Sequence, residues 1–246
     1  MRKYILLILL LGIGLLTATE YPDGMKILKQ IDNNMYATST VSTSKMVVRT
    51  KRGERTMVIK SYGEGDNNSF SEYLAPPREA GTKMLKLEDK LWIYEPSSDR
   101  TIQLSGNMLR QSVMGSDLSY EDFMEETKLS DLYEATVTGE AVVSERDCWL
   151  LDLKAKVKDI AYPHRLLWVD KKHSLALKEE RYAKSGKLLK TTIISEVMEV
   201  EGRFYPKVMT FKDELKKGKG TDIIIDEISF KEKIPSHIFT KSALRK

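Results

Sequence analysis

The strongest constraint on the fold is a series of short segments in which apolar and polar residues alternate, separated by turns that contain glycine or charged residues. An alternation of period two sends successive side chains to opposite faces of a strand, so each segment predicts a half-buried β-strand. Residues 42–51 and 56–62 form the first pair and join across Gly53, which predicts a hairpin. The series continues to residues 221–231 and predicts about ten antiparallel strands. We therefore expect a mainly β fold, a strongly curved antiparallel sheet or unclosed β-barrel.

Two segments break this alternation. Residues 23–33 place Met25, Leu28 and Ile31 on one side at a helical spacing, after Asp23 as a plausible N-cap. Residues 105–132 are rich in methionine and leucine without a strand period, and Ser119 with Asp122 resembles a capping box at a helix start. Because a curved sheet must be covered on its concave side, we expect both segments to act as covers.

The N-terminus has the three parts of a cleavable secretory signal. Arg2 and Lys3 precede an apolar run at residues 4–16, and small residues follow at 17–19. The alternative, an uncleaved membrane anchor, is disfavoured because a spanning helix needs about 20 apolar residues. We expect a signal peptide at residues 1–19, one domain at residues 20–246, and a mature protein that is soluble in the periplasm.

The position of the one cysteine supports a periplasmic protein that carries no lipid anchor. The one cysteine, Cys148, lies deep in the chain and next to apolar residues, so we expect a buried thiol and no internal disulfide. A lipoprotein would carry a cysteine at the cleavage point, where this chain has none. The mature protein is therefore expected to be diffusible and monomeric rather than tethered by lipid.

Charge and motif content exclude several functions. The net charge is +4, and basic and acidic residues are interspersed, so no stripe favours nucleic acid. The histidines, His164, His173 and His237, have no metal-ligand spacing, which predicts no metal site. No nucleophile elbow or phosphate-binding glycine loop occurs. We expect no enzyme activity and no cofactor, although a carboxylate pair brought together by the fold is an alternative.

The remaining candidates for function are apolar. Methionine suits surfaces that adapt to varied apolar partners, and an open barrel can enclose an apolar ligand. The alternative is that these residues fill the core. The candidates for lining an apolar ligand cavity are Phe70, Met84, Trp92, Tyr94, Met108, Met114, Phe123, Trp149, Leu151, Leu166 and Trp168.

Three segments together resemble a known family. They are MGSDLSYEDF at residues 114–123, RLLWVDK at 165–171 followed by LKEERY at 177–182, and the closing Ile234-Pro235 with Phe239-Thr240. In this order they resemble the bacterial outer-membrane lipoprotein-sorting protein family, relatives of the LolA and LolB lipoprotein carriers. The resemblance covers nearly the whole chain after the signal.

The resemblance implies a bent, unclosed sheet with helices on its concave side and a cavity that shields acyl chains in transit through the periplasm. It implies a carrier, in effect a transport chaperone, for an acylated lipoprotein or lipid, without catalysis or cofactor. The further partners implied are an inner-membrane transporter and an outer-membrane acceptor. The alternative is a periplasmic lipid-binding sensor or adaptor, similar to RseB-type regulators, that works with a membrane protein.

Overall fold

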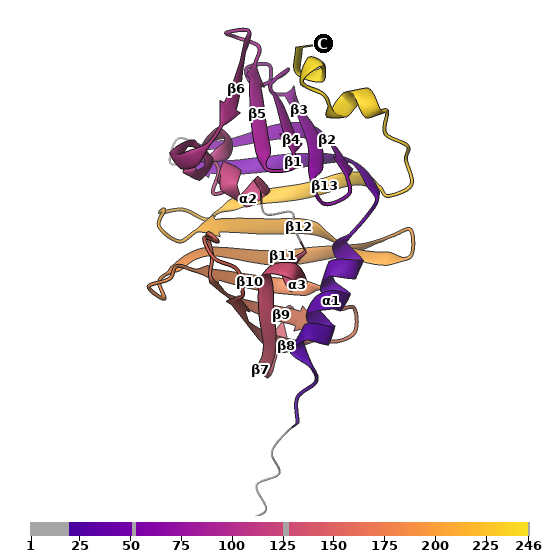
Figure 1. Cartoon of the computed structure of the whole chain (residues 1–246), viewed down its shortest axis with the longest axis vertical. Helices are drawn as coiled ribbons and strands as arrows, with labels where there is room; N and C mark the ends of the chain where they lie inside the picture. Colours follow the sequence, from indigo (N-terminus) through magenta and orange to yellow (C-terminus); the bar gives the residue numbers. More distant parts are fainter. Residues whose placement is uncertain (1–19, 51–52, 125–127, 246) are drawn as a thin grey trace, which may run out of the picture.

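The computed structural model describes residues 20–50, 53–124 and 128–245, so the expected signal peptide lies outside the described residues. Thirteen strands and several short helices are found in these ranges (Figure 1). The strands are β1 (Ser39–Thr50), β2 (Gly53–Glu64), β3 (Asn68–Ala75), β4 (Lys83–Leu87), β5 (Lys90–Glu95), β6 (Arg100–Leu104), β7 (Tyr133–Val143), β8 (Arg146–Ala155), β9 (His164–Asp170), β10 (Ala176–Tyr182), β11 (Leu188–Val200), β12 (Arg203–Asp213) and β13 (Thr221–Ser229).

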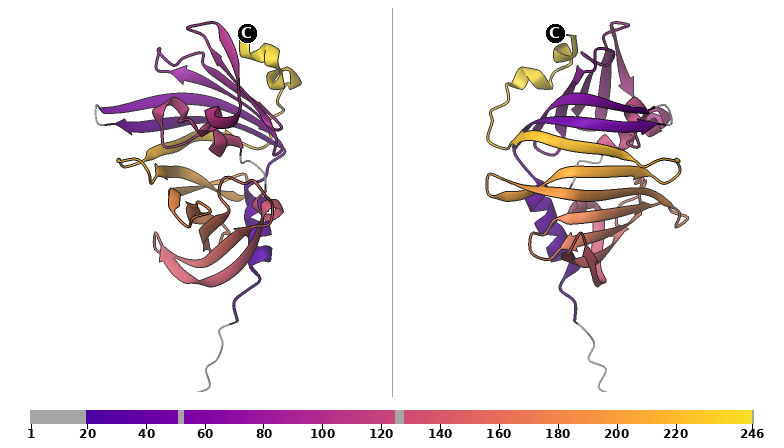
Figure 2. Two further views of the ribbon diagram at one scale, coloured as in Figure 1. Left: turned by 60° about the vertical axis from the view of Figure 1, so that its left-hand side comes forward. Right: turned by 180° about the vertical axis from the view of Figure 1, so that it is seen from behind.

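All thirteen strands belong to one antiparallel sheet with the order β6-β5-β4-β3-β2-β1-β13-β12-β11-β10-β9-β8-β7. Neighbours in the sheet are neighbours in sequence except at the centre, where β1 pairs with β13 and Val41 lies opposite Ser229. The edge strands β6 and β7 do not pair, so the sheet bends without closing (Figure 2). The predicted unclosed, curved antiparallel sheet is confirmed, with thirteen strands in place of about ten.

Helix α1 (Gly24–Met35) begins at the predicted N-cap. The carboxylate of Asp23 accepts a hydrogen bond of 2.8 Å from the backbone N–H of Met25. The apolar side of the helix then packs on β7, β8 and β9 (Figure 1). At Gly24 the two backbones are so close that a Cβ would lie 2.5 Å from the carbonyl oxygen of Ala135.

The described residues between 105 and 132, namely 105–124 and 128–132, are here called the cover segment and lie inside the bend of the sheet (Figure 2). They contain the 3-10 helices η1 (Gly106–Arg110) and η2 (Val113–Gly115) and the short α-helices α2 (Tyr120–Met124) and α3 (Leu129–Leu132). The first three pack on an apolar cluster from β1 to β6 that includes Met46, Met57 and Tyr73. Thus α1 and α3 cover one half of the concave face, and η1, η2 and α2 cover the other. Both segments act as covers, as their sequences predict.

The outer face of β3, β4 and β5 is also covered. Phe70, Leu85 and Trp92 lie opposite one another in register, on the face away from the cover segment. The C-terminal 3-10 helices η3 (Ser236–Phe239) and η4 (Lys241–Arg245) pack on them through Phe239 and Leu244. None of the helices in the described ranges has the length and apolar character needed to cross a membrane.

Candidate functional site

The structure separates the eleven predicted lining residues into several places. Four pack together on the concave face beneath or within the cover segment: Met84, Met108, Met114 and Phe123. Three lie on the outer face beneath the C-terminal helices: Phe70, Trp92 and Tyr94. Trp149 and Leu151 pack in the cluster beneath α1. Trp168 belongs to a fourth cluster, where the ammonium of Lys178 lies 4.1 Å from its ring centre, and Leu166 lies two residues before it on the same face of β9.

A first cavity, here called the cover hollow, has a volume of about 550 Å³ and lies between the cover segment, β5, β6, the start of β2 and the loop between β3 and β4. Its apolar lining consists of Ile93, Ile102, Leu104, Met108, Met114 and Tyr120. Two of the predicted candidates, Met108 and Met114, are among these side chains. Methionines of the cover and aliphatic residues of β5 and β6 thus form the apolar part of the boundary. The polar part of the lining consists of Arg55, Arg78, Glu79, Thr82, Glu95 and Gln111.

The tip of η2 is held in an unfavourable backbone conformation. Met114 has a φ of 50°, in the left-handed region that side chains other than glycine seldom adopt. Arg55 of β2 stabilises this tip, because its guanidinium donates a hydrogen bond to the carbonyl oxygen of Met114 and a second, of 3.0 Å, to the carboxylate of Glu79. The wall of the cover hollow therefore depends on one arginine.

Two aspartates of the cover segment fasten it to the sheet. Asp117 accepts a hydrogen bond of 2.9 Å from the hydroxyl of Thr221 and one of 3.0 Å from the backbone N–H of Asp213. The carboxylate of Asp122 accepts a hydrogen bond of 2.7 Å from the backbone N–H of Ser119. In return, the Ser119 hydroxyl accepts a hydrogen bond of 3.4 Å from the backbone N–H of Asp122. The predicted capping box is therefore confirmed. These hydrogen bonds explain why polar residues recur within residues 114–123.

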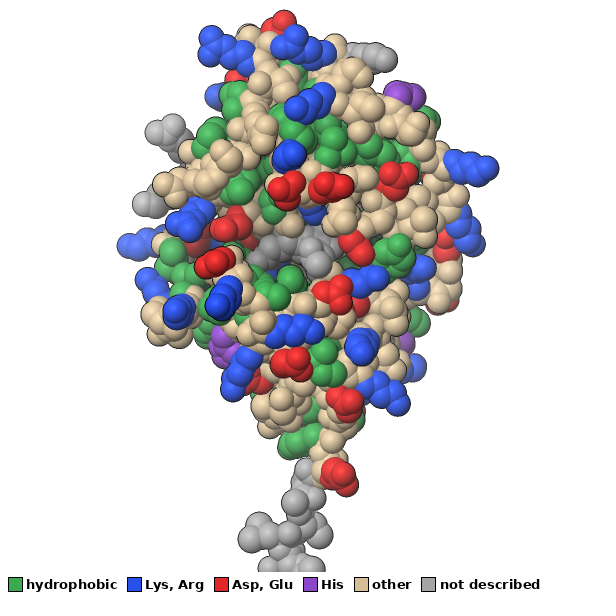
Figure 3. Space-filling view, viewed as in Figure 1, with side chains coloured by type: hydrophobic (Ala, Val, Ile, Leu, Met, Phe, Trp, Pro, Cys, Tyr) green, Lys and Arg blue, Asp and Glu red, His purple; other side chains and the backbone are tan. Residues whose placement is uncertain are grey.

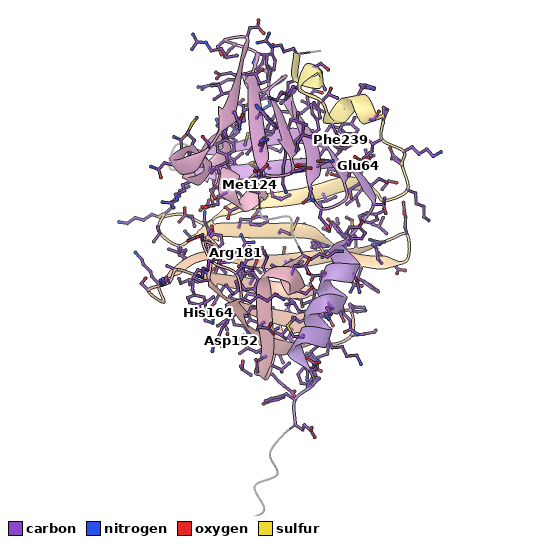
Figure 4. The ribbon with its side chains drawn as sticks, in the orientation of Figure 1. Glu64, Met124, Asp152, His164, Arg181 and Phe239 are labelled. Carbon is purple, nitrogen blue, oxygen red and sulfur yellow. The ribbon has the colours of Figure 1, made fainter. Side chains whose placement is uncertain are left out.

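Asp122 also joins a buried network of charges on the concave face of β9 and β10. Arg181 bridges Asp122 at 3.2 Å and Glu179 at 2.9 Å, and Arg165 bonds Glu179 at 2.8 Å. Figure 4 shows Arg181 among the strands on one side of the concave face, with Met124 of α2 on the other. Every carboxylate named here thus faces at least one guanidinium.

The arginines set the protonation of these carboxylates. Burial alone would raise the pKa of Glu179, but the charges of Arg181 and Arg165 and their hydrogen bonds lower it to about 2. Burial would also raise the pKa of Asp122, but the charges of Arg181 and Lys190 lower it below its usual value. Both groups are therefore ionised at neutral pH and hold the arginines in place.

A second cavity, here called the polar cavity, has a volume of about 490 Å³ and lies between β1–β3, the end of α1, the cover segment and β9–β10. One wall carries hydroxyls, from Thr40, Ser42, Ser61, Ser69 and Ser71. The facing wall carries Asp122, Arg165, Glu179 and Arg181. Figure 3 shows acidic and basic side chains intermixed across the middle of this side of the molecule, with hydrophobic side chains gathered above them.

Sequence reasoning did not single out the polar cavity. Of the eleven candidates, Phe123 alone is among its described lining residues. The available signal is that Glu179 and Arg181 alternate on one strand, as Ser69 and Ser71 do on another, at positions that a curved sheet would turn inward. Apolar alternation predicts which residues face the core, and it gives no indication of polar side chains on the concave face.

The histidines lie in structural contacts. His164 of β9 pairs with Asp152 of β8 at 3.1 Å, and Figure 4 shows both on the strands far from α2. His173 pairs with Asp170 at 3.0 Å within a turn. Within the described ranges, no group of three or more His, Cys, Asp or Glu residues is placed to hold a metal ion. Cys148 is buried, as predicted.

Comparisons with known proteins agree with this architecture. A family model that carries only the description of an uncharacterized protein matches residues 65–246. A DUF1329 family protein from Desulfovibrio piger is 25% identical with a TM-score of 0.82, over 90% of this chain and 97% of that one. A domain described as an outer membrane lipoprotein-sorting protein, from Vibrio parahaemolyticus, is 20% identical with a TM-score of 0.80, over 91% of this chain and 98% of that one.

A LolA superfamily protein from Nitrosomonas europaea has the same fold, with 23% identity and a TM-score of 0.73 over 91% of this chain and all 100% of that one. No curated protein matches the sequence. The family model spans most of the chain. The bent sheet of this chain superposes on the folds of the three structures. The chain therefore belongs to the family of that model, and it shares its fold with the DUF1329, lipoprotein-sorting and LolA superfamily structures.

Proposed function

We propose that this protein is a monomeric periplasmic carrier that shields the acyl chains of a lipoprotein or lipid during transport toward the outer membrane. The observation that carries the proposal is the cover hollow, where Met108 and Met114 of a fastened segment face Ile93 and Leu104 of an open sheet. The description of the Vibrio relative as a lipoprotein-sorting protein supports it. An inner-membrane transporter as donor and an outer-membrane acceptor complete the proposed route.

The energetics of transfer explain why such a carrier needs a cover that can move. Each buried CH₂ group contributes roughly 0.8 kcal/mol, so an acyl chain does not cross water unprotected. Release requires the cover to leave the sheet at modest cost. Asp117 and Thr221 meet this need, because water can replace their hydrogen bond once the segment lifts. The role consists of binding and release and needs no catalytic step.

Native mass spectrometry of the protein purified from the periplasm tests the proposal. We expect co-purified phospholipid or acylated peptide, and we expect the variant Met108→Gln to lose it because an amide in the hollow disfavours an acyl chain. Leu215→Gln is the control, since that leucine is exposed on the loop between β12 and β13. An empty protein bound stably to a membrane protein would instead favour the sensor or adaptor.

Hydrogen exchange tests the movement of the cover. We expect amides of residues 113–124 to exchange faster than those of β1 and β13, and to slow when lipid is bound. A cover segment as protected as these central strands, and unchanged by lipid, would contradict the proposed release step.

A further inference from the structure

We infer that the polar cavity binds the headgroup of the cargo and selects a headgroup that forms hydrogen bonds and has no net charge. The inference rests on the proposed function, because it assigns the second part of an amphiphile whose acyl part lies in the cover hollow. It narrows the cargo from acylated molecules in general to acylated molecules with a neutral or zwitterionic polar group.

The first support is a row of hydroxyls in register across three strands. Ser42 lies opposite Ser61, and Ser61 lies opposite Ser71, so all three face the same side of the sheet. The hydroxyl oxygens of Ser61 and Ser71 are 3.0 Å apart, and each retains capacity for a further hydrogen bond. The row therefore offers donors and acceptors to a ligand.

The same face changes character within a few residues. Met46, Met57 and Tyr73, further along the same three strands, are buried in the apolar cluster beneath the cover segment. A site for acyl chains alone would continue these apolar residues, because a buried hydroxyl without a partner costs free energy. The change from apolar side chains to hydroxyls matches the change from the tail to the headgroup of an amphiphile.

The second support is the balance of charge. Arg165 and Arg181 face Glu179 and Asp122 within hydrogen-bond distance, and Lys128 lies 3.8 Å from Asp66. Among the described lining residues, the remaining carboxylate is Asp32, which accepts hydrogen bonds of 3.0 and 2.8 Å from the first N–H groups of α3. Each charge of this described lining has an ion-pair or hydrogen-bond partner, so a ligand with net charge would add a charge without compensation. A neutral or zwitterionic headgroup carries no such penalty.

The third support is the position of α2 between the two cavities. Tyr120, at the start of α2, lines the cover hollow, and Phe123 of the same helix lines the polar cavity. In the proposed complex the amphiphile lies beneath α2, in place of the contacts that this helix makes with the apolar cluster, and extends from one cavity to the other. The volume of about 490 Å³ also falls within the range of roughly 300–1,000 Å³ typical of small-molecule sites.

Binding of four ligands with one lauroyl chain to the full-length mature protein tests the inference. They are laurate, monolauroylglycerol, lauroyl-lysophosphatidylethanolamine and lauroyl-lysophosphatidylglycerol, measured by calorimetry below their micelle concentrations. We expect the neutral glyceride and the zwitterionic ethanolamine lipid to bind about tenfold more tightly than the two anions, the equivalent of one or two added hydrogen bonds. Comparison of the glyceride with the ethanolamine lipid distinguishes a preference for a polyol from one for a zwitterion.

The variant S61A/S71A then tests the site. It should weaken binding of the two preferred ligands about tenfold and leave laurate unchanged, whereas Thr43→Val, on the opposite face of β1, should change none of them. Equal affinity for all four ligands, tighter binding of the anions, or equal weakening of all ligands by S61A/S71A would overturn the inference while carriage stands. If folded wild-type protein bound none of the four, the proposed function itself would fail.

Discussion

Arg181 of β10 and Asp122 of the cover segment form a buried ion pair of 3.2 Å, with the two side chains only 14% and 4% exposed. This contact connects the cover, which lies mostly on β1 to β6, with the other half of the sheet. The pair belongs to a network in which Lys190 also approaches Asp122, at 3.6 Å. Asp122, between these two cations, thus joins Asp117 in holding the cover on the sheet.

Replacing that carboxylate should loosen the cover and the fold together. In Asp122→Asn the shape is kept, but Arg181 and Lys190 each lose one buried negative partner and keep Glu179 and Asp213, respectively. We expect the free energy of unfolding in urea to fall by about 3 kcal/mol, as is typical of a broken buried pair. The control is Asp131→Asn, an exposed carboxylate of α3. Equal stability of the two variants would show that the ion pair does not hold the cover.

Acid should destabilise the protein partly through Glu179. Its pKa falls from 4.5 to about 2 on folding, so its contribution to stability is complete above pH 4.5 and is lost as the pH falls toward 2. The contribution is on the order of 3 kcal/mol. We expect Glu179→Gln to be less stable at pH 7 and to show a shallower loss of stability between pH 4.5 and 2. Parallel curves for the two proteins would contradict the assigned role.

The close approach of α1 to β7 predicts a sharp difference between two glycines. A Cβ at Gly24 would meet backbone atoms of Ala135 and Thr136, the nearest at 2.5 Å, whereas one at Gly139 of β7 would meet no atom within 4 Å. We expect Gly24→Ala to lower the thermal midpoint through a loss of about 1–3 kcal/mol. Gly139→Ala should leave it nearly unchanged. Similar midpoints for both variants would mean that α1 does not lie against β7 as described.

Removing one fastener should speed lipid release without abolishing binding. Thr221→Val deletes the hydroxyl that donates to Asp117 and accepts from its N–H, both at 2.9 Å. The loss should cost about 1–3 kcal/mol, mainly in the attachment of the cover. We expect faster dissociation of a fluorescent fatty acid in stopped-flow measurements. Thr138→Val, at an exposed threonine of β7, should dissociate at the wild-type rate.

The outer-face cluster should depend on Phe239. This side chain is buried against Phe70 and Trp92, so Phe239→Ala should expose apolar surface and cost about 3 kcal/mol. We expect stronger fluorescence of a hydrophobic dye with the variant. His237→Ala, at an exposed position of the same helix, should match wild type. No increase with Phe239→Ala would argue against the C-terminal helices covering this face.

Local patterns predicted most of the strands and both covers, because alternation and capping depend on residues close in sequence. These patterns could not show which face of the sheet each side chain lies on. Phe70 and Ser71 alternate as any strand residues do, and both faces of β3 are covered, so apolar character alone did not show that Phe70 points outward. The pairing of Arg181 with Asp122 could not be predicted, because the two residues are 59 positions apart in the sequence. The sequence resemblance predicted the fold, yet the hydroxyl row became visible only through the pairing of β1, β2 and β3.

The pairing of β1 with β13 gives the molecule a seam. Six strands that are contiguous in sequence, β1 to β6, lie on one side of it, and seven, β7 to β13, lie on the other. Each side is a meander of hairpins whose contacts are local in sequence, and such contacts form quickly. The seam itself joins residues as distant as Val41 and Ser229, and closing so long a loop is slow. The polar cavity draws its hydroxyls from the first meander and its arginines from the second. The cavity therefore needs both halves in place, so binding of the proposed headgroup there would report that the two halves have joined.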